Sequence, residues 1–400
     1  MTLLVFNSGS SSLKFGLFRQ GGPNTGSVLC KGIVRGIGGE QGRCDWQGSD
    51  AVKEHFALHA AQPGEAATQL VAWLQDRQPA WMRELQGLGH RVVHGGEAFS
   101  APARIDEAVA QHLERLSRLA PLHNPPALQV MRAARVALGP DVPMVAVFDT
   151  AFFHGLPEHA RRYALPAEWE GVQRLRRYGF HGIAHRYLYE RYAELSGADA
   201  HASRVVTLQL GQGCSMAAVR GAVPLDTSMG MTPLEGLVMA TRCGDVDPDL
   251  LLSLMIERGF TAEALHDALN HRAGLLGLSG ASADMKELLR LQPRHAGAAL
   301  AIDVFCHRAR KYLGAYFAVL EGADAVVFGG GIGENAPVIR ERICQGLQWC
   351  GLAIDRAANG AALGAEARIS TASSAVAAYV IPVDEESIIA RETRRTLNLA

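Results

Sequence analysis

The chain has 400 residues, enough for two domains that each bury a sizeable hydrophobic core. Hydrophobic residues make up 48% and charged residues 20% of the composition, which excludes an intrinsically disordered chain. The formal net charge of −1 provides no basic field, so we expect neither nucleic acid nor a membrane surface as a partner. The 43 glycines exceed ordinary usage, and they cluster in loops.

Cysteine usage and the first residues predict a soluble cytoplasmic protein. The seven cysteines form no CxxC pair and no zinc-site spacing, so we expect neither a disulfide framework nor a structural metal. The opening segment lacks the basic and long apolar regions of a signal peptide. No apolar run approaches the ~18 residues that a membrane span requires.

The first half of the chain alternates strand-like and helix-like patterns, as α/β folds do. Apolar and polar residues alternate after the Gly/Ser-rich loop 7–12, which predicts a β-hairpin with the opening strand. The apolar run 142–148 predicts a strand buried on both faces, and it leads directly into Asp149. The predicted elements are strands over 3–6, 13–18 and 142–148, helices over 66–75 and 105–119, and a helix capped by Asn124.

The second half repeats this opening design of strand, small-residue turn and strand. The repeat and the later elements are strands over 205–210, 216–219, 325–328 and 376–382, and helices over 248–257, over 296–320, near Pro337 and from Glu385. We therefore expect an α/β fold of two duplicated domains, with a ligand cleft between them. The expected domains are residues 1–149 with 386–400, and residues 150–385.

Three glycine/serine loops that follow strands are the strongest chemical signal in the sequence. They span residues 7–12, 211–215 and 329–335. Small residues let backbone N–H groups approach an anion closely. The first loop lacks the second glycine of a P-loop, and the second lacks the third glycine of a dinucleotide fingerprint. One such loop is adequately explained as a tight turn, whereas three in one chain favour phosphate binding.

Polar residues near these loops could hold a metal ion and a phosphate group. Asn7 and Glu385 both follow predicted strands, and their hard oxygen atoms suit Mg²⁺, which needs only one or two protein ligands besides phosphate and water. Lys14 stands just after the first loop and can reach a phosphate as a point charge. A solvated strand lysine is an equally good interpretation of Lys14.

Four further residues are candidates for the chemistry. Arg91 and Arg242 lie in largely apolar or small-residue surroundings, where a guanidinium suits a carboxylate or phosphoryl group, although a structural salt bridge explains each as well. His181 is flanked by glycines after an aromatic pair; a lone histidine is more often structural than catalytic, but this setting makes a donor near a substrate more credible than usual. Asp149 follows a buried strand, where α/β folds bind ligands.

Taken together, these motifs resemble the acetate kinase (acetate/propionate kinase) family of the actin–Hsp70–sugar kinase superfamily. The resemblance rests on eight motifs that occur in the family's order across nearly the whole chain. They are NSGSSSLK at 7–14, HRVVHGG at 90–96, PLHNPP at 121–126, FDTAF at 148–152, YGFHG at 178–182, DTSMG at 226–230, RCGDVDP at 242–248 and GGIGEN at 330–335.

The resemblance implies reversible, ATP-dependent phosphorylation of acetate to acetyl phosphate by direct in-line transfer, in two actin/ribonuclease H-like domains that form a homodimer. Propionate or another short carboxylate is the alternative acceptor. Mg²⁺, or Mn²⁺ in its place, is the implied metal, held by Asn7 and Glu385. The implied ATP contacts are Ser10, Ser12 and Lys14, together with the stretches Gln209-Leu210-Gly211-Gln212-Gly213, Asp284-Met285-Lys286 and Gly331-Ile332-Gly333-Glu334-Asn335.

By the same resemblance, Arg91 binds the carboxylate or the transferring group, Asp149 is the acid/base-type residue, and His181 and Arg242 stabilise the transition state. The implied apolar pocket for the acyl methyl group comprises Val93, Leu122, Phe180 and Pro233. A carboxylate substrate is already ionised at pH 7 and needs no general base. We therefore expect Asp149 to orient groups and balance charge more than to move a proton.

The second phosphate loop departs from the family, which usually has His-Leu-Gly-Asn-Gly where this chain has Gln209 to Gly213. The glycines are kept, but Gln209 brings no positive charge, although its amide still donates hydrogen bonds. We predict a functional kinase with a slower or altered reaction. Lys286 in place of the family's usual arginine is a milder departure near the adenosine.

Two other classes of protein remain as alternatives. A nucleotide-gated binding protein of the Hsp70/actin type would share the fold and loops, but it has no need for Arg91, His181 and Arg242 near the γ-phosphate. A sugar or polyol kinase would need a base for a hydroxyl group and several polar residues around the sugar. The candidate pocket residues are apolar instead.

Overall fold

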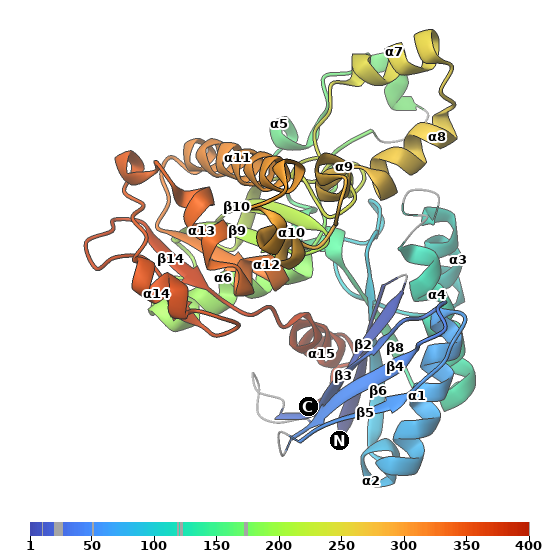
Figure 1. Cartoon of the computed structure of the whole chain (residues 1–400). Helices are drawn as coiled ribbons and strands as arrows, with labels where there is room; N and C mark the ends of the chain where they lie inside the picture. The colour runs from blue at the N-terminus through green and yellow to red at the C-terminus, as the bar shows by residue number, and fades with distance from the viewer. Residues whose placement is uncertain are drawn as a thin grey trace. The chain divides into compact units, whose positions relative to one another are not determined.

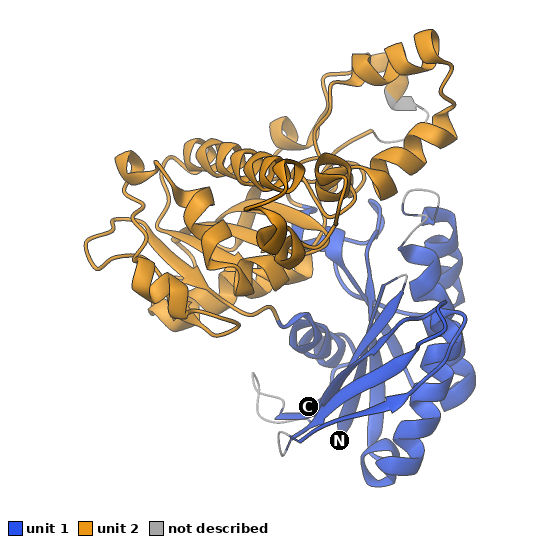
Figure 2. Ribbon diagram, viewed as in Figure 1, with its two compact units in different colours: residues 1–154, 384–400 blue, residues 155–383 orange. Residues whose placement is uncertain are grey.

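The computed structural model describes residues 1–9, 11–19, 27–49, 52–117, 120, 123–171 and 175–399. It divides into two compact units, which Figure 2 shows in blue and orange. Unit 1 comprises residues 1–154 and 384–400, and unit 2 comprises residues 155–383. The sequence-based boundaries fall after residues 149 and 385, whereas in the structure residues 150–154, Asp384 and Glu385 belong to unit 1.

Unit 1 is built on an eight-stranded sheet with the order β5-β4-β3-β2-β1-β6-β8-β7. Strand β1 pairs antiparallel with β2 and parallel with β6, and β6 pairs parallel with β8, so the carboxyl ends of β1, β6 and β8 meet at one edge. Its elements are β1 (Thr2–Ser8), β2 (Ser12–Arg19), β3 (Ser27–Arg35), β4 (Arg43–Gly48), β5 (Lys53–Ala57), α1 (Pro63–Arg77), α2 (Pro79–Arg83), β6 (Leu85–Val92), β7 (Ala103–Arg104), α3 (Glu107–Leu116), α4 (Asn124–Leu138), β8 (Met144–Phe148), the 3-10 turn η1 (Asp149–Phe153) and α15 (Glu385–Thr396).

The core of unit 1 follows from the alternation predicted for β2. Leu13, Phe15 and Leu17 are buried, whereas Lys14 between them is exposed. The buried side chains pack with the apolar faces of α1 and α4, and α15 packs on the other face of the sheet, against β1, β6 and β8 (Figure 1). Burial of each such side chain contributes roughly 1.5–3 kcal/mol, so this alternation fixes which face of the strand turns inward.

Unit 2 repeats this plan around a six-stranded sheet with the order β11-β10-β9-β12-β14-β13. The hairpin β9–β10 is followed by β12 parallel to β9 and β14 parallel to β12, as β6 and β8 follow the β1–β2 hairpin. The two halves are therefore duplicated, as the sequence predicts. The strands are β9 (Arg204–Leu210), β10 (Cys214–Arg220), β11 (Val223–Thr227), β12 (Ala325–Gly329), β13 (Ala367–Arg368) and β14 (Ala377–Val380).

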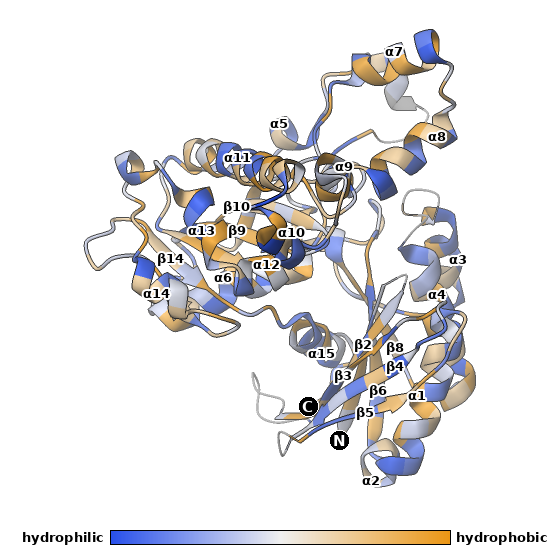
Figure 3. Ribbon diagram, viewed as in Figure 1, coloured by the Kyte–Doolittle hydropathy of each residue, from blue (hydrophilic) through white to orange (hydrophobic). Residues whose placement is uncertain are grey.

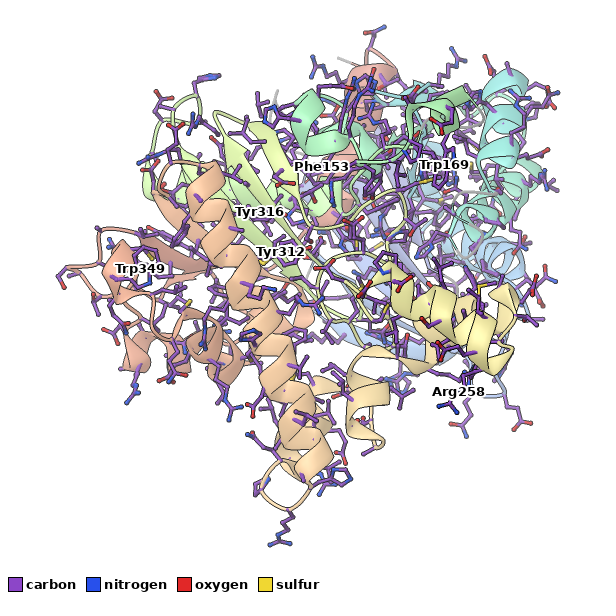
Figure 4. All side chains as sticks on the ribbon, turned by 90° about the horizontal axis from the view of Figure 1, so that it is seen from above. Phe153, Trp169, Arg258, Tyr312, Tyr316 and Trp349 are labelled. Atoms are coloured by element: carbon purple, nitrogen blue, oxygen red, sulfur yellow. The ribbon has the colours of Figure 1, made fainter. Side chains whose placement is uncertain are left out.

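Helices cover both faces of the second sheet, with α6 (Gly182–Ser196) and α11 (Ala296–Val319) each packed against β9 and β10. Tyr316 of α11 is buried and stacks edge-on against Tyr312, whose hydroxyl donates to Asp245 Oδ2 at 2.9 Å (Figure 4). The other helical elements are α5 (Glu158–Arg161), η2 (Ala167–Gly171), α7 (Pro248–Arg258), α8 (Ala262–Asp267), η3 (Ala268–Arg272), α9 (Gly274–Ser279), α10 (Met285–Leu291), α12 (Gly330–Asn335), α13 (Pro337–Cys344), η4 (Gln348–Cys350) and α14 (Arg356–Ala361).

Hydrophobic stretches, drawn in orange, occur in both sheets (Figure 3), and β1 and β12 are buried at every position. None of the helices in the described ranges combines the length and apolarity that a membrane span needs.

The predicted cap of α4 is wrong, and the correction involves the site. His123 is the N-cap and makes no side-chain cap bond, and Asn124 is the first helical residue. The Asn124 side chain instead accepts from the backbone N–H of His94 at 3.1 Å and donates to the His94 carbonyl at 3.0 Å. Asn124 therefore holds the loop after β6 in place.

Candidate active site

Three predicted polar residues meet at the carboxyl edge of the first sheet. Asn7 lies near the end of β1, Arg91 near the end of β6, and Asp149 directly after β8. Arg91 Nη2 donates to Asp149 Oδ2 at 2.6 Å, and its Nε lies 3.2 Å from both carboxylate oxygens. Arg91 Nη1 donates to Asn7 Oδ1 at 3.1 Å. The parallel pairing of the three strands therefore builds one polar cluster.

Charge balance within this cluster keeps Arg91 ionised. The Asp149 side chain has no exposed area, and that of Arg91 is only 16% exposed. Burial alone would lower the pKa of Arg91, but the negative charges of Asp149 and Glu385 raise it above its usual value. The bonds to Asp149 and Asn7 use three of the five guanidinium N–H groups, which leaves one on each terminal nitrogen for an anionic ligand.

Two glutamates at the start of α15 complete the cluster. Asn7 Nδ2 donates to Glu385 Oε2 at 2.7 Å and to Glu386 Oε1 at 2.9 Å, and both glutamates are buried. Asp384, one residue earlier, caps α15 by accepting from the Ser387 backbone N–H at 3.1 Å. Sequence reasoning missed Glu386, although its position next to Glu385 was a usable signal.

This donor set fits the implied magnesium ion. Two adjacent buried carboxylates supply hard oxygen ligands, and Mg²⁺ typically takes one or two carboxylates and completes its shell with water and phosphate. The Asn7 amide oxygen already accepts from Arg91, so the glutamates are the stronger candidates. In the described part of the chain, no group of three or more His, Cys, Asp or Glu residues could hold a metal on its own.

The remaining candidates of the first unit are less closely tied to this cluster. Val93 is buried just after β6. Lys14 is exposed and lies with Glu386 at a cavity of about 510 Å³ lined by residues of β2 to β5. Ser12 accepts from the Gly9 backbone N–H through its carbonyl at 2.8 Å. Ser10 and Leu122 lie outside the described residues.

In unit 2, a second constellation forms around Gly213. A Cβ atom built on Gly213 would lie 2.8 Å from Arg242 Nη2 and 3.3 Å from His181 Nε2. Only glycine leaves this space open, so the arginine and the histidine both border the same small volume beside the loop backbone. Phe180 is buried next to His181, and Pro233 accepts from Arg242 Nη1 through its carbonyl at 2.6 Å. The structure thus brings these predicted residues together.

Arg242 is a half-buried cation with no compensating carboxylate within 4.0 Å in the described part of the chain. Burial lowers its pKa from the usual value, yet a guanidinium remains charged at every working pH. Its backbone is packed tightly, because a Cβ on Gly274 (φ +60°) would lie 2.7 Å from the Arg242 carbonyl oxygen. A buried positive charge of this kind is costly unless an anion binds beside it.

His181 has a strained backbone, with φ +55° and ψ +27° at the start of α6. This left-handed region is unfavourable for a residue with a Cβ and is concentrated at functional sites. His181 Nδ1 lies 2.8 Å from Ser215 Oγ, so its two ring nitrogens face Ser215 and the space at Gly213.

A cavity of about 710 Å³ in unit 2 unites parts of all three predicted nucleotide stretches. It is lined by Gly211, Gln212, Ala240, Ala283, Asp284, Met285, Lys286, Leu289, Gly331, Ile332, Asn335, Ala336 and Leu363. Its size and its mostly apolar lining suit a nucleoside. Sequence reasoning missed its alanines and leucines, which have no local pattern that separates them from core residues.

Other residues of those stretches have structural roles instead. Leu210 is buried in the sheet, and Gly333 packs against Phe328. Glu334 Oε1 accepts from the backbone N–H groups of Gly330 at 2.9 Å and Val383 at 3.0 Å. These three residues, which the family resemblance implies as nucleotide contacts, are not among the residues that line the cavity.

Gln209, the main departure from the family, is only half-buried, but its Oε1 atom is inaccessible and has no hydrogen-bond partner in the described part of the chain. A buried unpaired acceptor costs about 1–3 kcal/mol.

Arg340 of α13, which sequence reasoning missed, fixes two walls of the cavity. Its guanidinium is fully buried and donates to the carbonyls of Gly333 and Ala362 and to Asn359 Oδ1, each at 2.8 Å. Gly333 lies in α12 and Ala362 precedes the lining residue Leu363, so one side chain ties both segments together.

Comparison with known proteins identifies the relatives of this fold and site. The acetokinase family model matches residues 2–391. Acetate kinases of Chloroherpeton thalassium and Solibacter usitatus are 42% and 44% identical, and each alignment covers 99% of this chain and 98–99% of the relative. The crystal structure of Porphyromonas gingivalis acetate kinase superimposes with a TM-score of 0.89 at 38% identity over 99% of both chains. That of a Francisella tularensis propionate kinase also gives 0.89, at 35% identity over 98% of this chain and 99% of the other. The chain therefore belongs to the acetate kinase family.

Proposed function

We propose that this chain is an acetate kinase that transfers the γ-phosphoryl group of ATP directly and reversibly to acetate and forms acetyl phosphate. The observation that carries the proposal is the convergence of Arg242 and His181 on Gly213, whose neighbours Gly211 and Gln212 line the nucleotide cavity. The terminal phosphate of a nucleotide in that cavity would lie beside these donors. Such an arrangement suits phosphoryl transfer.

Arg242 and His181 act on the charge of the transferring group. The phosphoryl group passes through a loose transition state whose charge is spread over three equatorial oxygens, so catalysis is mainly positioning and electrostatic stabilisation. Arg242 contributes a half-buried positive charge that no carboxylate of the described chain compensates, and His181 contributes a ring nitrogen on the same side. In a water-poor site these groups stabilise a developing charge strongly.

Arg91 and Asp149 serve the acceptor. The two N–H groups of Arg91 that Asp149 and Asn7 leave over can bind the acetate carboxylate. Acetate is ionised at pH 7, so no proton has to be removed before it attacks. Asp149 holds the guanidinium through three contacts of 2.6–3.2 Å, which supports an orienting role for this residue.

Glu385 and Glu386, with Asn7 between them and Arg91, are the residues that would hold Mg²⁺, and Mn²⁺ is a chemically similar substitute. When bound, the ion neutralises charge on the phosphate oxygens. The two carboxylates repel each other, and the Asn7 amide holds them side by side by donating to both.

The size of the acceptor is the finer part of the proposal. The described candidates for the methyl pocket, Val93, Phe180 and Pro233, are apolar and provide no polar groups for a sugar. One methylene group changes binding in an apolar pocket by only ~1–3 kcal/mol, so propionate is the alternative acceptor. The homodimer, the cytoplasmic location and the preference for ATP stay predictions.

Detection of acyl phosphate as its hydroxamate tests this function. The purified chain is incubated with magnesium and acetate, propionate or butyrate, each with ATP, GTP or pyrophosphate as donor. We expect the highest kcat/KM with acetate and ATP. A higher value with propionate would reassign the acceptor, whereas ATP hydrolysis that is indifferent to every carboxylate would favour a nucleotide-gated binding protein.

A further inference from the structure

A hydrogen-bonded series of four polar side chains runs from the anion site, the space at Gly213 that Arg242 and His181 border, into the core of unit 2. His181 Nδ1 lies 2.8 Å from Ser215 Oγ, and His185 Nε2 lies 2.7 Å from the same oxygen. His185 Nδ1 then lies 2.7 Å from Thr207 Oγ1. The four residues come from α6, β9 and β10, so three separate elements build the chain.

This hydrogen-bonded series lies in the protein interior, where burying polar groups costs free energy. His185, Ser215 and Thr207 have no exposed surface. Burying a hydroxyl or an imidazole without hydrogen bonds costs about 1–3 kcal/mol by mutational measures, and apolar side chains of similar volume would fill the space at less cost. The hydroxyls therefore serve a purpose beyond packing.

The two hydroxyl groups allow the hydrogen bonds of the series to be donated in either of two directions. A hydroxyl donates one hydrogen bond and accepts others, whereas a neutral imidazole donates at one nitrogen and accepts at the other. When Thr207 donates to His185 Nδ1, His185 Nε2 donates to Ser215, and Ser215 donates to His181 Nδ1. The proton of a neutral His181 then has to stand on Nε2, the nitrogen that faces Gly213.

In the reverse direction His181 donates from Nδ1, and the lone pair of Nε2 faces the space that Arg242 also borders. A lone pair suits the neighbouring cation while no anion is bound, but it repels a phosphate. The two directions differ only in hydroxyl rotation and proton position, so the ring can change from acceptor to donor without moving.

We propose that Ser215, with His185 and Thr207 behind it, is a positioning residue that keeps a proton on Nε2 of neutral His181 when a phosphate occupies the site. His181 then donates a hydrogen bond to the transferring group without having to carry a positive charge beside Arg242. The inference rests on the proposed function, because it assigns the bound anion to the phosphate of a nucleotide.

The ¹⁵N resonances of labelled histidine test the proposal directly, because they report which ring nitrogen is protonated. In the wild-type chain bound to magnesium and a non-hydrolysable ATP analogue at pH 8, we expect His181 to carry its proton on Nε2. In Ser215→Ala we expect a mixture of both tautomers. A wild-type complex with the proton on Nδ1 overturns the proposal.

Steady-state kinetics provides the second readout. A mixture of tautomers keeps part of the donor population, so we expect Ser215→Ala to lower kcat by about two- to tenfold, less than the 10²–10³-fold loss that follows outright removal of a transition-state donor, while both KM values stay within about twofold. Ser215→Thr, which keeps the hydroxyl, restores most of kcat. Ser203→Ala is the matched control, because Ser203 is also buried but bonds to the Asp199 carbonyl away from the site.

Thr207→Val keeps the shape of the side chain and removes the last hydroxyl of the hydrogen-bonded series. It therefore tests the proposal if Ser215→Ala does not fold. We expect a mixed tautomer at His181 and a smaller loss of kcat. Variants with wild-type tautomers and wild-type kcat overturn the proposal. A wild-type chain that makes no acyl phosphate would instead overturn the proposed function.

Discussion

The two candidate arginines illustrate opposite ways of burying a positive charge. Arg91 in unit 1 faces the fully buried carboxylate of Asp149 at 2.6 Å and has Glu385 within 3.9 Å. Arg242 in unit 2 donates to a backbone carbonyl, that of Pro233, and has no carboxylate within 4.0 Å in the described part of the chain. Accordingly, nearby negative charge raises the pKa of Arg91, whereas burial lowers that of Arg242.

This difference suggests two roles: one arginine orients a substrate, and the other stabilises the charge of the transferring group. A guanidinium that is paired with a carboxylate has a fixed direction, but most of its charge is already balanced. A guanidinium without a carboxylate keeps its charge for a ligand and destabilises the empty protein until an anion arrives. We therefore expect Arg91 to position the acceptor and Arg242 to respond to the charge of the transferring phosphoryl group.

The largest expected effect is the loss of Arg242. Arginines that act on a transferring phosphoryl group contribute about 10³–10⁵ in rate, so Arg242→Gln should lower kcat by that order. Because the substitution removes a half-buried charge that has no carboxylate partner in the described part of the chain, the ligand-free protein should melt no lower than the wild type. Thermal melts with and without magnesium and ATP check this, and the stabilisation by ATP should shrink.

Arg290→Gln is the matched control for this prediction, since Arg290 is a well-exposed arginine of the same unit. It should keep both kcat and the response to ATP. If Arg242→Gln melted several degrees lower than the wild type without ligand, the proposed contrast between the two arginines would be wrong.

The second prediction concerns Asp149, whose removal leaves Arg91 without its partner. Breaking a buried ion pair by deleting one side typically costs about 3–5 kcal/mol, whereas removing both charges costs less. Urea denaturation should therefore show a larger loss for Asp149→Ala than for the double variant Arg91→Gln/Asp149→Asn. Asp303→Asn at an exposed pair should change the stability little. A double variant that is less stable than Asp149→Ala would contradict this order.

A third prediction concerns the loss of stability in acid that a buried histidine of unit 1 causes. His90 on β6 is fully buried against Phe6, and its pKa is lowered to about 3, first by burial and second by the charge of Arg135. The unfolded chain takes up this proton near pH 6.5, so the folded state loses stability as the pH falls from about 6.5 to about 3. The slope contributed by this residue is at most about 1.4 kcal/mol per pH unit.

Comparison of urea midpoints at pH 7, 6, 5 and 4 isolates this contribution. His90→Gln should be less sensitive to acid than the wild type, so the difference between the two should shrink or reverse at low pH. His201→Gln, at an exposed histidine of unit 2, should follow the wild-type curve. Parallel curves for His90→Gln and the wild type would refute a buried neutral His90.

The sequence could reveal residues whose local context is unusual, and it missed those whose role depends on distant contacts. Strand endings and glycine spacing marked Asn7, Arg91, Asp149, His181 and Arg242 as candidates, and the family resemblance implied their roles. The structure brings them into two clusters. The helix over 248–257 is confirmed as α7 (Pro248–Arg258), capped by Asp247 and ended by Gly259 with φ +69°, because those signals are local.

Other residues carried no local signal. Arg340 belongs to a short helix with charged neighbours and has the pattern of a surface residue, but contacts with segments about 20 residues away bury it completely. Asn124 has the composition of a helix cap, yet a loop 30 residues earlier takes its side chain. In both cases tertiary hydrogen bonds override the local preference, and a single sequence cannot show such partners.

The smallest expected effect concerns Gln209, which separates the anion site of this chain from that of its relatives. Its Oε1 atom is buried and finds no partner among the described residues, so the amide uses only part of its hydrogen-bonding capacity. Gln209→His restores the family's usual residue, which can donate and can be charged near a phosphate. A charge-assisted bond is worth about 1–2 kcal/mol more than none, so kcat/KM for ATP should rise roughly 5- to 30-fold.

Gln129→His is the matched control, since Gln129 in unit 1 also has a buried Oε1 atom that has no partner within the part of the chain that the structure describes. It should leave kcat/KM for ATP unchanged, because its burial problem is the same but no phosphate binds there. A gain in Gln209→His that falls as the pH rises through the usual range of histidine would assign the effect to charge. No gain at any pH would mean that Arg242 and His181 already supply the cationic character that the loop of this chain lacks.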